Sequence, residues 1–190
     1  MPDADRSEPL ETPRLPHLSP EQMSPEQLEV HRAIVEGPRS GLQAHTPLPG
    51  PFNAMVHGER VGNALQALGV AIRYESSLSD RCRELAILMV AAFHHSEYEW
   101  ADHEPIARRV GLTSDETAAL RRGEVPDLTD SGEVATAQVV HALLHDGDIG
   151  DEIYAFADRH LGARRLVEIT TLVGYYSTLA MQLRVFRVSG

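Results

Sequence analysis

Residues 83–103 read RELAILMVAAFHHSEYEWADH, and this stretch decides both the fold and the chemistry of the chain. Leu85, Leu88, Met89 and Ala92 recur at intervals of three and four residues, which is the spacing of one face of an α-helix. Ionisable side chains flank the apolar stripe at both ends. The stretch therefore predicts an apolar helix followed by a polar one, with acids and imidazoles between them.

Helix-start signals recur along the rest of the chain. Ser, Thr and Asp side chains accept hydrogen bonds from free backbone N–H groups at helix N-termini, and Glu or Gln three residues later completes a capping box. Apolar residues at helical spacing, ending at Ile72, predict another helix, and residues 163–185 predict a long apolar one. No strand-like alternation is sustained, so the sequence predicts an all-α protein, a helical bundle. We expect helices to begin near Ser24, Val61, Ser79 or Asp80, Ser96, Thr113, Asp130 and Ala163.

The length of 190 residues fits one domain with a proper core. Residues 1–23 are rich in Pro, Glu and Ser, which predicts a flexible N-terminal arm before a single domain at 24–190. Prolines and glycines in residues 40–51 predict an irregular loop. The formal net charge is −11 and no cluster of Lys and Arg appears, which argues against nucleic acid or an anionic membrane as partner.

Cys82 is the single cysteine, so neither an intramolecular disulfide nor a cysteine-based zinc site can form. No apolar run approaches the roughly 20 residues that a membrane span requires. The first residues are acidic and lack the pattern of a secretory signal. We therefore expect a cytoplasmic protein.

The acids and imidazoles of the central stretch have ordinary interpretations as well as catalytic ones. Glu84 can be an exposed first-turn carboxylate that complements the helix dipole. Ser96 and Glu99 have the spacing of a capping box. Glu99 and His103 are four residues apart and share a helix face, either as a solvated pair or as an acid–base pair.

The same stretch resembles the core motif of the alkylhydroperoxidase-D-like and carboxymuconolactone-decarboxylase superfamily. In that motif a helix opens with a basic residue and Glu, and a Cys-x-x-Cys pair and a His follow. Glu84 and His103 match the Glu and the His, whereas Ser96 and Glu99 stand where the two cysteines would be. The resemblance covers roughly residues 40–187. It includes Gly50 to His57 and the Gly-Tyr-Tyr run at 174–176.

The missing cysteine pair argues against the peroxidase branch, which needs a reactive thiolate and a resolving cysteine. Ser96 and Glu99 can supply neither, and Cys82 has no second cysteine to pair with. The resemblance then implies the decarboxylase side of the superfamily, which works without metal or organic cofactor. It also implies a homo-oligomer: a dimer, trimer or hexamer.

We expect a cofactor-independent acid–base enzyme, of lyase or decarboxylase type, on a small lactone, keto acid or similar carbonyl compound. Glu84 and His103 would form the proton relay, with Glu99 as second carboxylate. In a dry site a carboxylate's pKa would rise to about 6–7. The expected site residues are, for catalysis, Glu84, His103, Glu99, Ser96 and Tyr98, and, for substrate binding, His57, His95 and Trp100.

Two alternatives remain open at this point. One is a residual oxidoreductase that uses Cys82 or a bound metal, and the other is a non-catalytic binding or assembly protein. His95, Glu99 and His103 would make a metal triad on an unbroken helix, but a break near Ser96 weakens that pattern. We therefore expect no metal and no cofactor.

Overall fold

The computed structural model of the chain describes residues 12–39 and 48–188. Within these residues it contains nine α-helices and no strand, so the all-α prediction is confirmed. A short 3-10 helix, η1 (Pro20–Gln22), precedes them, and a π-helical turn, η3 (Ala71–Glu75), extends the third. The α-helices are α1 (Pro25–Val35), α2 (Pro51–His57), α3 (Arg60–Val70), α4 (Asp80–Phe93), α5 (Glu97–Arg109), α6 (Ser114–Arg121), α7 (Ser131–His145), α8 (Asp151–His160) and α9 (Gly162–Phe186).

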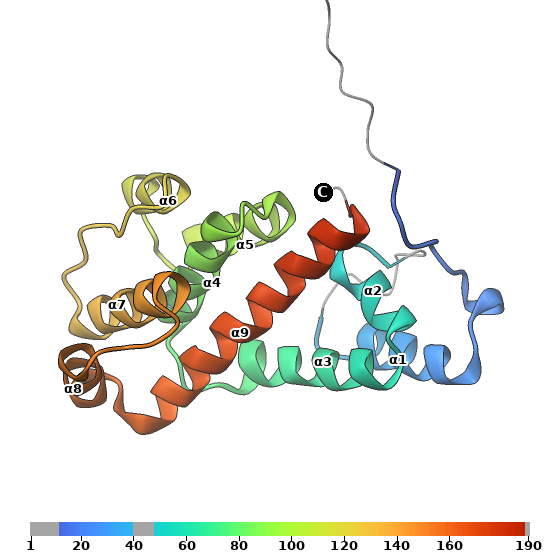
Figure 1. Cartoon of the computed structure of the whole chain (residues 1–190), viewed down its shortest axis with the longest axis horizontal. Helices are drawn as coiled ribbons and strands as arrows, with labels where there is room; N and C mark the ends of the chain where they lie inside the picture. The colour runs from blue at the N-terminus through green and yellow to red at the C-terminus, as the bar shows by residue number, and fades with distance from the viewer. Residues whose placement is uncertain (1–11, 40–47, 189–190) are drawn as a thin grey trace, which may run out of the picture.

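Helix α9 crosses the molecule diagonally between two groups of helices (Figure 1). Helices α4 to α8 lie on one side of it, and α1 to α3 lie on the other. Its buried residues, among them Ile169 and Leu172, come from the long apolar segment that the sequence predicted. Because α9 contacts α4, α7 and α8 as well as α2, α3 and η3, it joins the two groups into one molecule.

Helix α4 lies at the centre of the larger group. It contacts α5, α6, α7 and α9, and every residue from Glu84 to Ala91 is buried. A helix that is apolar nearly all round is stable only inside a core. The one ionisable residue within this buried run, Glu84, therefore needs a partner in the interior, since an isolated buried charge is very costly.

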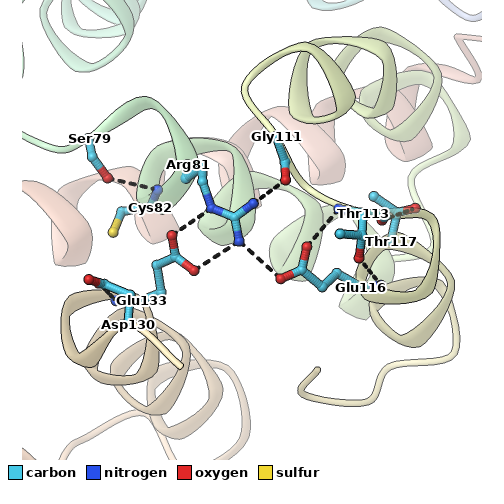
Figure 2. Close-up of polar contacts among 9 residues, drawn as sticks. All are labelled: Ser79, Arg81, Cys82, Gly111, Thr113, Glu116, Thr117, Asp130 and Glu133. Atoms are coloured by element: carbon cyan, nitrogen blue, oxygen red, sulfur yellow. Dashed lines mark hydrogen bonds and ion pairs between the residues drawn. The ribbon is translucent and has the colours of Figure 1, made fainter. Parts of the chain in front are cut away.

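The start of α4 is held by the guanidinium of Arg81 (Figure 2). Arg81 donates two hydrogen bonds to the carboxylate of Glu133 on α7, at 2.6 and 2.9 Å, and one to Glu116 on α6, at 2.9 Å. It also donates to the backbone carbonyl of Gly111. Three segments thus converge on one side chain, which fixes the N-terminal turn of α4 three residues before Glu84.

The helix-start signals are confirmed at four positions, one of them Ser79 at the start of α4, and fail in part at a fifth. Ser24 and Thr113 form complete capping boxes, and Asp130 accepts hydrogen bonds from the first turn of α7. Ser96 stands at the N-cap of α5 as predicted, but its side chain caps nothing. The capping box expected there is wrong, because Glu99 is buried and faces His103 instead of bonding back to Ser96.

Helix α3 forms as predicted, but only part of its apolar stripe is buried, and Ile72 at the end of the stripe lies in the core. Val61 is 71% exposed and Leu68 is 38% exposed. The buried residues of the helix are Gly62, Gln66 and Gly69. The helix therefore turns its small side chains inward and presents apolar ones to the surface.

Close approach of neighbouring groups explains this orientation. A Cβ atom on Gly62 would lie 1.7 Å from the backbone oxygen of Met55 in α2. A Cβ atom on Gly69 would lie 2.2 Å from the hydroxyl of Tyr175 in α9. Only glycine permits both contacts, so tight packing against α2 and α9 decides which face of α3 is buried.

The N-terminal segment from residue 12 onward lies against the body of the protein. The backbone N–H of Arg14 donates to the carbonyl of Phe186 at the end of α9. The carbonyl of Pro16 accepts a hydrogen bond from Asn53 in α2. Residues 1–11 of the predicted arm, and residues 40–47 of the predicted loop, lie outside the described residues.

Candidate functional site

Glu84 and His103 meet in the interior, from α4 and α5. Glu84 Oε2 lies 2.7 Å from His103 Nδ1, and each residue is only 1% exposed. The other carboxylate oxygen of Glu84 lies 3.6 Å from Nε of Arg83, which partly balances its charge. The structure therefore brings together the two residues on which the sequence-based hypothesis depended.

The hydrogen bond sets the tautomer of the imidazole. A carboxylate oxygen only accepts, so Nδ1 of His103 carries the proton that it donates to Glu84. In the neutral ring Nε2 is then left with a free lone pair. A carboxylate that holds Nδ1–H in this way orients the ring and stabilises the imidazolium that forms when Nε2 takes up a proton.

Three polar side chains surround Nε2 of His103. The hydroxyl of Tyr176 on α9 lies 3.4 Å away, Asp102 Oδ2 lies 3.7 Å away, and Glu99 Oε2 lies 3.9 Å away. The ring of Tyr176 also meets the imidazole edge-on, with centroids 5.3 Å apart. None of these contacts is a short hydrogen bond. The lone pair of His103 Nε2 therefore lies among donors and acceptors but is not committed to any one of them.

Glu99 is the most perturbed carboxyl group of the site. Burial, and to a smaller extent the nearby carboxylate of Asp102, raise its pKa from 4.5 to about 8, although Arg73 opposes the shift. Its Oε1 atom is buried and has no hydrogen-bond partner. At neutral pH this side chain is therefore largely a neutral acid with a proton to donate.

The tyrosines near the site remain protonated far above neutral pH. Burial raises the pKa of Tyr175 and of Tyr98 to about 12 each, and raises that of Tyr176 well above its ordinary value. All three phenols are therefore hydrogen-bond donors at neutral pH. Tyr98 packs against Gly50, where a Cβ atom would lie 2.1 Å from its ring, so α2 begins directly beside it.

The remaining predicted site residues make no hydrogen bond or ion pair with Glu84 or His103 in the described part of the chain. Ser96 Oγ is buried without a hydrogen bond. His57 Nε2 lies 2.8 Å from the carbonyl of Pro16, and His95 is exposed. Trp100 donates to Glu104 and stacks against the guanidinium of Arg121 at 4.7 Å. Their roles in binding substrate stay predictions.

Three residues at the site did not emerge as candidates from the sequence: Tyr176, Asp102 and Arg73. Tyr176 belongs to the Gly-Tyr-Tyr run that carried part of the resemblance, but no role in the site was predicted for it. Asp102 adjoins His103 and reads as an ordinary helix-surface acid. Arg73 has no sequence signal, because only the fold brings η3 to α5, where Arg73 lies 3.8 Å from Asp102.

The structure does not bring together the residues of the metal triad or of the thiol alternative as it brings together Glu84 and His103. His95 precedes α5 with a φ of 52°, so it does not continue the face of Glu99 and His103. Among residues 12–39 and 48–188, no group of three or more His, Cys, Asp or Glu side chains is arranged to hold a metal ion. Cys82 is buried in the first turn of α4. No helix in the described ranges is long and apolar enough to cross a membrane.

Comparison with known proteins gave one family and two informative structures. Residues 59–142 match the carboxymuconolactone decarboxylase family. A protein of unknown function from Agrobacterium tumefaciens, described as a candidate antioxidant defence protein AhpD, is 18% identical over 68% of this chain and 90% of its own, with a TM-score of 0.61. The apo debrominase Bmp8 is 14% identical over 90% of this chain and 89% of its own, with a TM-score of 0.67.

At these identities the two structural matches establish a shared fold. No curated protein matched the sequence. The family match spans α3 to most of α7, and thus contains Glu84, Glu99 and His103 but not Tyr176.

Proposed function

We propose that this chain, whose residues 59–142 match the carboxymuconolactone decarboxylase family, is a cofactor-independent acid–base enzyme of lyase or decarboxylase type. Its substrate would be a small lactone or keto acid. The observation that carries the proposal is the buried Glu84–His103 pair, whose free Nε2 faces Tyr176 and Glu99. Fully buried Glu and His side chains are rare unless they are paired or used in chemistry.

The first step is proton removal by His103. With Nδ1–H held by Glu84, Nε2 takes a proton from the carbon next to the substrate carbonyl, and the electron pair of the C–H bond moves to form an enolate. The protonated Glu99 and the hydroxyl of Tyr176 donate hydrogen bonds to the enolate oxygen. Both donors are neutral acids at pH 7, so neither repels the developing negative charge.

A decarboxylation differs in that the electron pair of the enolate comes from a C–C bond, in a substrate whose carboxylate is attached to the carbon next to the carbonyl. The bond to the departing carboxylate breaks, CO₂ leaves, and the electron pair of that bond enters the enolate. Glu99 then protonates the carbon and recovers a proton from water. The step needs no oxidant or reductant, and the groups that it uses are all present around Nε2 of His103.

The test is turnover of a panel of lactones and of 2- and 3-keto acids, followed by mass spectrometry and by release of CO₂. Glu84→Gln and His103→Asn should each lower kcat by a factor of about 10²–10⁴, the usual contribution of a positioned acid–base group. Asp115→Asn, an exposed acid on α6, is the matched control and should leave turnover unchanged. Wild-type rates in both site variants would refute the proposal.

An assay of peroxide consumption with a thiol donor distinguishes the oxidoreductase alternative. Cys82 is 6% exposed and is the only cysteine of the chain, so no partner thiol could close a disulfide with it. We expect no thiol-dependent peroxide consumption, and Cys82→Ala should leave lyase turnover intact.

We also propose that the chain forms a homo-oligomer in the cytoplasm. Apolar side chains on the outer faces of α3 and α9 support this: besides Val61 and Leu68, they include Val167, Met181 and Val185, each more than half exposed. A second copy would remove that surface from water. The lone unpaired Cys82 fits a reducing compartment.

A further inference from the structure

Arg73 reaches the site through its ion pair with Asp102, a residue of α5. Arg73 itself lies in η3, the π-helical turn that extends α3 and contacts α9. π-helical turns are rare and occur frequently at functional sites. The side chain is only 20% exposed, so its charge is largely withdrawn from water.

The guanidinium of Arg73 has few partners for so buried a cation. A guanidinium carries five N–H donors, yet Arg73 donates no hydrogen bond within the described part of the chain. Its contacts are an ion pair with Asp102 Oδ2 at 3.8 Å, beyond hydrogen-bond distance, and the ring of Tyr74 at 5.7 Å. Arg81, by contrast, donates to two carboxylates and a carbonyl.

Arg73 is also next to the face of His103 on which the chemistry is proposed. Asp102 Oδ2 stands between them, 3.8 Å from Arg73 and 3.7 Å from Nε2 of His103. The side chain of Asp102 is 57% exposed, so it can turn into water when another anion takes its place. The carboxylate of Glu84 is also within electrostatic range of the guanidinium.

We propose that Arg73 binds a carboxylate of the substrate beside His103, displacing Asp102. The substrate class is therefore an anionic carbonyl compound, held by a two-pronged guanidinium–carboxylate contact. This assignment rests on the proposed function for its placement at the reacting face. Binding alone, however, needs neither Glu84 nor proton transfer, so the two proposals can fail separately.

The test is isothermal titration calorimetry of the full chain with 2-oxoglutarate, and with its neutral diethyl ester as ligand control. Wild type should bind the acid and not the ester. Arg73→Gln should weaken binding of the acid by about 10- to 100-fold, the value of a charge-assisted bidentate contact. Arg73→Lys keeps the positive charge but lacks the planar, two-pronged guanidinium. It should therefore bind the acid more tightly than Arg73→Gln but less tightly than wild type. Arg122→Gln, an exposed arginine paired with Glu124, is the control and should bind as wild type does.

Glu84→Gln separates this inference from the proposed function. This variant should bind 2-oxoglutarate with the affinity of wild type, but it should lose turnover in the test of the proposed function. The inference is overturned if wild type binds neither compound, if it binds acid and ester alike, or if Arg73→Gln and Arg73→Lys both bind as wild type does. Each of those results would leave the turnover test of Glu84 and His103 unaffected.

Discussion

The two sides of the site are built in opposite ways. On the side of α4 and α5, Glu84 and His103 are fully buried and joined by a 2.7 Å hydrogen bond. On the side of η3, Arg73 is held by one ion pair of 3.8 Å. A group that must be positioned to a fraction of an ångström for proton transfer gains from rigid support, whereas a group that must receive a ligand needs unused donors.

The helices that support these two sides, α4 and α3, also differ in how firmly they are packed. In α4 the apolar residues point into the core, and the start of the helix is fixed by Arg81. In α3 the glycines point inward, while Val61 and Leu68 face outward. The α4 side is therefore complete within one chain, and the α3 side presents surface that a second copy could cover.

The largest expected effect comes from breaking the rigid side. In a double-mutant cycle, Glu84→Gln and His103→Asn should each reduce kcat by about 10²–10⁴, and the double variant should lose little more than either alone. The reason is that Glu84 acts through the imidazole that it orients. Steady-state kinetics on the substrate found in the panel measures the cycle. Additive losses would show that the two residues act independently.

A pH effect on stability should follow from Glu99, which stands between the two sides. Its pKa is about 8 in the folded chain against 4.5 ordinarily, so between these values the folded state holds a proton that the unfolded state has released. Stability must then fall as pH rises from about 4.5 to about 8, by on the order of 4 kcal/mol from this group.

Glu99→Gln removes that titration. Urea unfolding at several pH values should show a flatter dependence in the variant than in wild type over this window. The exposed Glu97→Gln, two residues away, serves as the control and should retain the wild-type slope. Parallel curves for wild type and Glu99→Gln would contradict the raised pKa.

Removing the Arg81 anchor of α4, which lies outside the site, should have a smaller effect, on the free energy of unfolding. Arg81→Gln leaves Glu133, which is only 11% exposed, without its cation, and should cost on the order of 3 kcal/mol of unfolding free energy. Arg122→Gln removes an exposed pair that water screens, and should cost much less than Arg81→Gln does. Equal losses in the two variants would show that Arg81 does not anchor the helix.

The α3 side is probed by a pair of glycine substitutions. Gly62→Ala places a methyl group against the backbone of α2 and should destabilise the chain by about 1–3 kcal/mol. Gly174→Ala, where nothing lies within 4 Å, should stabilise α9 by up to about 1 kcal/mol. Thermal unfolding measures both, and a gain in Tm for Gly62→Ala would mean that α2 and α3 are not tightly packed.

Local sequence patterns predicted most of the helices of the fold. The spacing of Leu85, Leu88 and Met89 predicted α4, and cap residues such as Ser24 and Thr113 predicted helix starts that the structure confirms. These features depend on residues a few positions apart. The resemblance was also predictable, because its motif lies within one contiguous stretch, and residues 59–142 match the carboxymuconolactone decarboxylase family.

The site was only partly predictable for the same reason. Glu84 and His103 fall within that stretch, but Tyr176 and Arg73 reach them from α9 and η3, over contacts that no local pattern encodes. The capping box at Ser96 failed because burial of Glu99 beside His103 competed with a local hydrogen bond. The faces of α3 were likewise set by close packing rather than by hydropathy.

The π-helical turn that carries Arg73 has an evolutionary consequence. Such a turn contains one residue more than an α-helical turn, so deletion of a single codon within residues 71–75 would restore regular winding. Because the helix ends at Glu75, the change would be confined to this turn and would move Arg73 around the helix axis. Lineages could in this way exchange the residue offered to the ligand in one genetic event, while the proton-transfer pair on the other helices is inherited unchanged.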